Sequence, residues 1–254
     1  QAVALLLITA YRSRVGTVLH PLAALRRVTV TGWAGLLALG APQSLNFVGV
    51  ALVSSAILVA LQWVKAPDYE TSVTAYGIVT RSLTFAILPV LGLAQAMQTI
   101  TGNNHGAGNG RRVRGSLALA AGVALLFCAA VQAIATLFAG RIGAMFVSDA
   151  RVIAEVAAIM PVMVMLYALS GPLVMVASHF QAVGDAPRAA LLGLSKPYLF
   201  ALPLTFALPG LFGAAAIWWA APVAEGMLAL LTAAVLFQAA RGAKTSREIK
   251  EIQA

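Results

Sequence analysis

Charged residues are scarce in this 254-residue sequence. Only 10% of the residues are charged, and eight of them are acidic, whereas a soluble domain usually carries about 25% charged residues. So few charges cannot cover the surface of a soluble globule of this size. Since 61% of the residues are hydrophobic and the mean hydropathy is +0.90, the composition predicts an integral membrane protein.

Cysteine and catalytic motifs are also nearly absent. Cys128 is the single cysteine and lies in an apolar run, so no internal disulfide and no cysteine-based metal site are predicted. The patterns HExxH and GxSxG do not occur. The glycine-rich segment GNNHGAGNG at 102–110 lacks the lysine and the serine or threonine of a phosphate loop. These absences predict that the chain is not an enzyme and holds no metal and no cofactor.

Long apolar runs dominate what is present, and each is long enough to cross a bilayer as a helix, which takes about 20 residues. The prediction is an all-α, polytopic bundle of six transmembrane helices over residues 35–64, 72–101, 117–138, 152–180, 189–208 and 211–239. Prolines at 42, 161, 172 and 222 are expected to bend these helices. The pair Pro209-Gly210 is expected to form the tight turn before the last one.

The flanking segments complete the predicted domain organisation. Residues 1–10 are interpreted as the end of a preceding transmembrane helix, since QAVALLLITA is about half a span. Residues 11–34 are interpreted as a cytoplasmic linker with an amphipathic helix at the membrane surface. The six-helix lobe covers 35–240, and 241–254 form a short cytoplasmic tail. We therefore expect the sequence to be part of a longer protein.

The net charge of +9 is interpreted as a topology signal rather than a nucleic-acid surface. Of the 17 lysines and arginines, thirteen lie in alternate connections, namely 11–31, 102–116, 181–197 and the tail, and three lie in the others. Because cytoplasmic loops are enriched in lysine and arginine, we expect these alternate connections to be cytoplasmic. The remaining cation, Arg81, falls inside a predicted span.

Charged residues within spans are functional candidates, because a charge in hydrocarbon is costly. Arg81 lies about ten residues into the second span, and Glu225 lies about fourteen residues into the sixth. They are the candidates for ion coupling, either as a buried ion pair or through a proton-responsive acid lining a cavity. A purely structural pair, or a Glu225 that faces water beyond a kink at Pro222, is the alternative.

Uncharged polar and polarizable side chains supply the candidates for substrate binding. Proline-broken helices expose backbone groups that are tolerated only against protein or water, which favours cavity positions near Pro42 and Pro89. Flexible methionine side chains suit a surface that binds varied ligands. The predicted substrate-binding residues are Gln43, Asn46, Gln95, Met163 and Tyr167; hydrogen bonding and packing between helices is the alternative for all of them.

The segment from Ala75 to Arg114 resembles the multidrug and toxic compound extrusion (MATE) family. AYGIVTR opens a span, PVLGLAQAMQTITGNNHGAG crosses and leaves it, and RRVR begins the next cytoplasmic stretch. HFQAVGDAPRA at 179–189 and LGAPQSLNF at 39–47 are similar to the exit of the fourth helix and the entry of the first helix of a MATE lobe.

This resemblance implies the C-terminal lobe of a two-lobe transporter in a bacterial inner membrane. Such proteins export cationic, amphiphilic compounds in exchange for protons or sodium by alternating access. The implied partners are those substrates, the bilayer and the N-terminal lobe of the same protein. Sodium-coupled members carry acids in the first and fourth helices of this lobe, whereas Asn46–Ala51 and Ser170–Pro172 contain none, which leaves Glu225 as the deep acid available here.

Two alternatives to a drug antiporter remain open at this stage. A flippase of the same superfamily would move lipid-linked precursors and would need several cations in its cavity. A membrane scaffold subunit that does not transport would need larger loops to bind partners.

Overall fold

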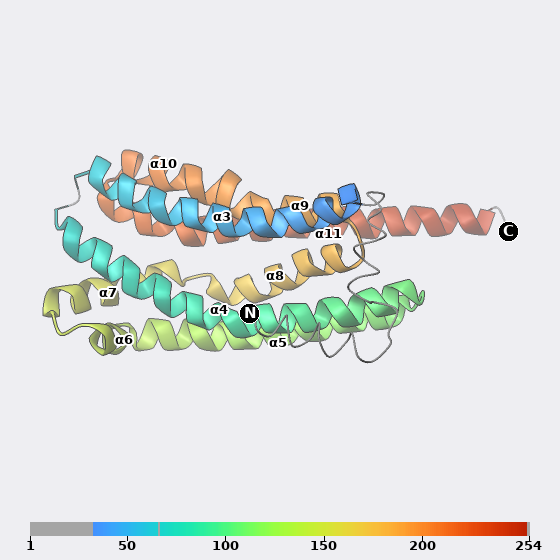
Figure 1. Cartoon of the computed structure of the whole chain (residues 1–254), viewed down its shortest axis with the longest axis horizontal. Coiled ribbons are helices and arrows are strands. Elements are labelled where there is room, and N and C mark those ends of the chain that lie inside the picture. The colour runs from blue at the N-terminus through green and yellow to red at the C-terminus, as the bar shows by residue number, and fades with distance from the viewer. Residues whose placement is uncertain (1–32, 66, 253–254) are drawn as a thin grey trace, which may run out of the picture. The chain divides into compact units, whose positions relative to one another are not determined.

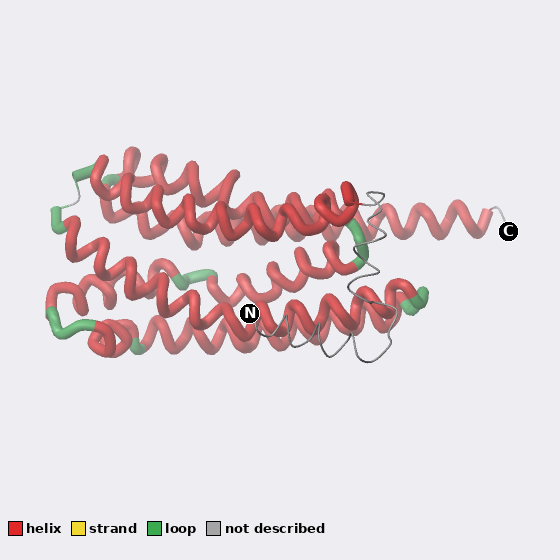
Figure 2. The backbone as a smooth tube through the Cα atoms, viewed as in Figure 1, coloured by secondary structure: helices red, strands yellow, loops and turns green. Residues whose placement is uncertain are grey.

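The computed structural model describes residues 33–65 and 67–252, with side chains described as far as Arg241 except at 33, 35, 36, 38 and 39. The predicted end of a preceding helix (1–10) and most of the predicted linker (11–34) lie outside the described residues. The chain divides into two compact units, residues 1–38 and 39–254. The site and its packing belong to the second unit. All its regular elements within the described ranges are helices (Figure 2).

The helices follow one another through short connections (Figure 1). Their bounds are α3 Trp33–Trp63, α4 Tyr69–Gly106, α5 Gly110–Leu137, α6 Ala139–Phe146, α7 Ala150–Met163, α8 Tyr167–Ala182, α9 Ala186–Leu194, the π-helix η1 Ser195–Ala201, α10 Leu202–Phe212, the 3₁₀ helix η2 Ala214–Trp219 and α11 Ala220–Ile252. Within the second unit, α8 packs against α4, α5, α9 and α11, and α11 also packs against η1.

Membrane-spanning length and composition recur through the chain as predicted. Five helical segments are long and apolar enough to cross a membrane, and α7 with α8 form a sixth candidate that is bent by 50°. Large apolar side chains such as Phe85, Leu119 and Leu126 are exposed, which is the arrangement expected of a lipid-facing surface. The all-α bundle predicted from the sequence is therefore confirmed. Helix α11 also continues through most of the segment predicted as a tail.

The bend between α7 and α8 lies at Val164–Leu166, just beyond Pro161. Gln132 of α5 satisfies two backbone groups around it. Its Nε2 donates to the carbonyl of Met165 at 2.7 Å, and its Oε1 accepts from the amide of Ala168 at 2.8 Å. Because hydrocarbon offers no hydrogen bonds, backbone freed by a break must be satisfied within the protein. The side-chain carboxamide of Gln132 thus bridges the backbone on the two sides of the break.

The turn expected at Pro209-Gly210 is displaced along the chain. Both residues lie within α10, which continues to Phe212, and the chain turns at Gly213 with φ 86°. Pro209 removes only its own N–H from the helix, whereas the backbone at Gly213 has a conformation that side-chain-bearing residues rarely adopt. The prediction was wrong because a proline–glycine pair does not by itself end a helix.

Aspartates begin three of the helices that follow loops. Asp68, Asp149 and Asp185 are the N-caps of α4, α7 and α9, and each side chain accepts a hydrogen bond from a backbone amide in the first turn. At Asp149 this bond, from the amide of Arg151, lowers the pKa of the carboxyl below its ordinary value of 3.8. The loop aspartates of the sequence therefore have a structural explanation as helix caps.

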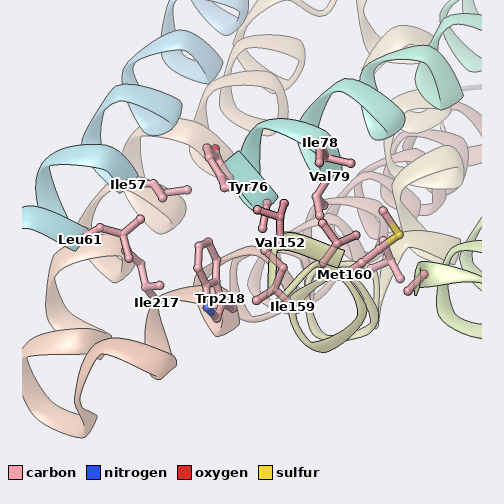
Figure 3. Close-up of a cluster of buried hydrophobic side chains, with 14 of the residues drawn as sticks. Ile57, Leu61, Tyr76, Ile78, Val79, Val152, Ile159, Met160, Ile217 and Trp218 are labelled. Atoms are coloured by element: carbon pink, nitrogen blue, oxygen red, sulfur yellow. The ribbon is translucent and has the colours of Figure 1, made fainter. Parts of the chain in front are cut away.

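Two apolar clusters lie beside the sites of the second unit, and a third cluster joins Val176, Phe180, Leu192 and Val235. The larger cluster joins α3, α4, α7 and η2, and within it Tyr76 and Trp218 stack with ring centroids 6.0 Å apart (Figure 3). The smaller cluster joins α4, α5 and α8 around the fully buried Cys128. Beside it, Gly171 lies so close to α5 that an added Cβ would be 2.6 Å from the carbonyl oxygen of Ala124. This close approach fixes α8 against α5.

Candidate functional site

A cleft of about 100 Å³ lies among α3, α4, α8 and α9. It brings together Gln43 and Asn46 of α3 with Gln95 of α4, three of the five predicted substrate-binding residues. Its other lining residues are Pro42, Leu91, Ala94, Gln98, Val174, Ala177, Ser178, Gln181, Ala189 and Gly193. Gln43 and Asn46 thus lie in the cleft together with the nearby Pro42, and a substrate-binding role for them stays a prediction.

Carboxamides give the cleft its chemical character. Gln43, Asn46, Gln95, Gln98 and Gln181 each carry an acceptor oxygen and an NH₂ donor, and Gln98 Nε2 donates to Gln181 Oε1 at 3.4 Å. Among the described residues, none that lines the cleft is charged. The cleft can therefore exchange hydrogen bonds with a ligand while its alanine, leucine, valine and proline walls contact apolar surface.

Met163 and Tyr167 do not line this cleft. Met163 packs against the larger core cluster, and Tyr167 packs against both clusters. Met160 and Met175 of the same broken span are fully buried. The structure thus separates the two predicted groups, carboxamides in the cleft and methionines mainly in the core. Binding roles for Met163 and Tyr167 remain predictions.

A second site is built around Glu225 of α11, whose side chain is only 6% exposed. Lys196 of η1 forms an ion pair with its Oε2, and Ser170 of α8 donates a hydrogen bond to its Oε1 at 2.8 Å. Three elements thus meet at one carboxylate. The pairing satisfies both oxygens of a charge that would be costly to bury alone.

The buried ion pair between Arg81 and Glu225, one of the interpretations of these two residues, is not formed in this structure. Arg81 is exposed, although Ile78 and Val79 just before it on α4 are buried, and it forms no ion pair with Glu225, whose carboxylate is paired elsewhere. Lys196, rather than Arg81, is the cation paired with Glu225. From the sequence alone, Lys196 was counted among the cytoplasmic loop cations. Its position, about seven residues into the fifth predicted span, was the signal that could have identified it as a cation within a span.

Tyr167 lies next to this charged site rather than to the cleft. It precedes Ser170 by three residues on α8, which places both side chains on one face of the helix. Its hydroxyl is buried and has no hydrogen-bond partner among the described residues.

The π-helix η1 connects the charged site to the cleft. Such a helix has wider turns than an α-helix and often occurs at functional sites. Tyr198 of η1 donates its hydroxyl to the carbonyl of Leu45 on α3 at 2.9 Å. A Cβ on Gly49 of α3 would lie 2.7 Å from Pro197. The element that carries Lys196 is therefore packed against the α3 wall of the cleft.

Metal binding finds no support in the described part of the chain. No group of three or more histidine, cysteine, aspartate or glutamate side chains is arranged there to hold an ion. The prediction that no protein-held metal is needed remains untested, since a coupling cation can be bound transiently by fewer ligands.

Comparisons with known proteins identify the fold. The family model described as MatE matches residues 42–207. Among curated proteins, the chain is similar to the multidrug export protein MepA of Staphylococcus aureus, with 22% identity over 166 residues that cover 65% of this chain and 36% of MepA.

Solved structures of MATE transporters have the same fold as this chain. The MATE multidrug transporter DinF-BH is 29% identical, with a TM-score of 0.71 over 82% of this chain and 46% of that one. A variant of the Vibrio cholerae MATE transporter VcmN has the same fold at 17% identity, with a TM-score of 0.75 over 85% of this chain and 49% of that one. The chain thus spans half or less of the length of these relatives. With the family model matching well over half of its residues, the chain belongs to the MatE family of multidrug and toxic compound extrusion transporters.

Proposed function

We propose that this chain is the C-terminal half of a secondary active antiporter that exports cationic, amphiphilic compounds from bacterial cells in exchange for protons or sodium. The uncharged, carboxamide-lined cleft between α3, α4, α8 and α9 carries the proposal. The names of MepA, a multidrug export protein, and of DinF-BH, a multidrug transporter, support it. The relatives' additional length is consistent with a partner lobe that precedes this one.

The chemistry of the cleft suits part of such a substrate. Carboxamide oxygens accept hydrogen bonds from ammonium or amine groups, and the apolar walls cover rings or alkyl chains. Since no described lining residue is charged, this lobe would bind without fixing the substrate by a single ion pair. That arrangement favours a broad range of substrates over one.

Ion coupling in this lobe would fall to Glu225, which is the deeply buried acid among the described residues. Its ion pair with Lys196 joins it to η1, and η1 in turn contacts α3 beside the cleft. A change in the charge of Glu225 therefore has a short structural path to the substrate-binding wall. The coupling ion is a proton or sodium.

The test uses the full-length protein in cells that lack their main efflux pumps. Gln95→Leu and Asn46→Ala should alter resistance to individual drugs by about 2- to 10-fold each, since one hydrogen bond contributes about 0.5–1.5 kcal/mol. The order of preference among drugs should change while the protein level stays constant. Gln62→Leu, at an exposed position of α3 outside the cleft, is the matched control.

The outcome against the proposal is also defined. Equal loss of resistance to every drug in both cleft variants, or no change at all, would show that the cleft does not select substrates. Drug exchange in proteoliposomes under an imposed pH gradient or an imposed sodium gradient identifies the coupling ion. If neither gradient drives exchange, the antiporter mechanism is wrong.

A further inference from the structure

The two members of the buried ion pair differ in how freely they can move. Glu225 is 6% exposed and projects from the long helix α11, whereas the side chain of Lys196 is 40% exposed. A lysine keeps its ammonium on a flexible four-carbon stem and can turn it toward water. The exposed part of Lys196 gives its ammonium a way out of the pair, whereas the buried Glu225 carboxyl would need another partner inside the protein.

A hydrogen-bond donor without a partner in the described part of the chain lies one helical turn from Ser170 on α8. The hydroxyl of Tyr167 is buried and unpaired among the described residues, although a buried polar group that makes no hydrogen bond destabilises the fold. Ser170, one turn further along the same face of α8, is already bonded to Glu225. A Cβ on Gly226 would lie 3.4 Å from Leu166, so α11 and α8 are packed together at this level.

We propose that Lys196 is a displaceable counter-ion of Glu225, and that the Tyr167 hydroxyl becomes the hydrogen-bond partner of the carboxyl when Lys196 leaves it. In the present state the carboxylate is bonded to Lys196 and Ser170. In the second state the carboxyl has taken up a cation, Lys196 faces water, and Tyr167 and Ser170 hold the carboxyl. Tyr167 is thereby a positioning residue of the charged site and not part of the substrate cleft.

The surroundings of Glu225 are compatible with two such states. Lys196 of η1 is the titratable group in contact with the carboxyl among the described residues, and Tyr167 lies one helical turn from Ser170, which bonds the same carboxyl. Of these, Lys196 alone carries a charge at neutral pH. The departure of one side chain is therefore enough to change the net charge of the site, and η1, which carries that side chain, also contacts α3.

A thermal double-mutant cycle on the purified full-length protein tests the proposal. In the otherwise unchanged protein, Tyr167→Phe should leave the melting midpoint unchanged or raise it, because it removes an unpaired hydroxyl. In the Lys196→Met background, where Glu225 has lost its counter-ion, Tyr167→Phe should lower the midpoint by about 2 °C or more. Equal effects in both backgrounds would overturn the proposal.

Further variants keep the test decisive. If Lys196→Met does not fold, Glu225→Gln provides the same second state with a neutral partner, and Tyr167→Phe should again lower the midpoint there. Lys196→Arg retains the pair, so the effect of Tyr167→Phe in it should match that in the parent protein. Tyr76→Phe, at a buried tyrosine of the larger core cluster, is the matched control and should have one effect in every background.

A transport measurement tests whether the second state takes part in ion-coupled exchange. This test rests on the antiporter function proposed above. Tyr167→Phe should slow ion-coupled exchange without lowering the melting midpoint, and Lys196→Arg should preserve more exchange than Lys196→Met. Exchange that is unaffected by Tyr167→Phe would contradict a role for the second state. The melting cycle does not depend on transport. It therefore tests the displaceable ion pair even if the proposed antiporter function is wrong.

Discussion

Gln132 gives the sharpest test of how the broken span is held. Its Nε2 and Oε1 bond the carbonyl of Met165 and the amide of Ala168 on either side of the bend between α7 and α8. Gln132→Leu removes both bonds and keeps the side-chain volume nearly constant. The Met165 carbonyl, at an exposed bond, and the Ala168 amide, at a partly buried one, would then lack a hydrogen-bond partner in the apolar surroundings of the span, so the bend loses its support.

The expected loss follows from the two bonds. Hydrogen bonds between transmembrane helices contribute about 0.6 kcal/mol each on average and up to about 2 kcal/mol. A buried backbone group left without a partner costs about 1–3 kcal/mol. Because the helix ends can relax partly toward one another, we expect Gln132→Leu to lower the free energy of unfolding by about 2–4 kcal/mol in total.

The assay is reversible unfolding of the full-length protein in mixed micelles, followed by circular dichroism and by thermal melting. Gln62→Leu, the same substitution at an exposed position of α3, should change the free energy of unfolding by less than about 0.5 kcal/mol. A loss at Gln132 no larger than that of the control would refute the reasoning. The bend would then be held by side-chain packing rather than by the carboxamide.

Two further predictions concern packing and topology. Gly171→Ala should destabilise the protein by about 1–3 kcal/mol in the same assay, because the new methyl group would meet the α5 backbone, whereas Gly122→Ala, which meets nothing within 4 Å, should be neutral or stabilising. In intact cells, a membrane-impermeant thiol reagent should label Asp68→Cys from outside and should not label His105→Cys or Arg188→Cys; labelling of all three would refute the predicted orientation.

The fold was largely predictable because its dominant signal is local. A run of about 20 apolar residues can satisfy its backbone in a bilayer only as a helix, so the spans follow from composition alone. The ends of the helices and the breaks within them do not follow from composition. The turn lies at Gly213 because that glycine adopts a positive φ, and the bend lies just beyond Pro161, where Gln132, distant in sequence, bonds the backbone on both sides.

The sites were predictable only in part, for a related reason. Gln43 and Asn46 were recognised because a nearby proline is itself a local mark of irregular backbone. Arg81 was chosen for its depth in a span, but depth does not say which way a side chain points. Lys196 was missed because its pairing with Glu225 is set by how η1 and α11 pack, which no single segment of sequence contains.

The π-helix η1 also has a consequence for chain length. A π-helical turn inside an α-helix contains one more residue than the same path needs. Deletion of one residue within Ser195–Ala201, such as the exposed Leu199, would close the wide turn and leave α9 and α10 presenting their present faces. A deletion in the uninterrupted α5 would instead rotate every later side chain by about 100°. Among the described spans, η1 is thus a place where proteins of this fold could differ in length by one residue and keep the register of the flanking helices. A chain without that residue would lose the wide turn from which Lys196 and Tyr198 reach partners on two different helices.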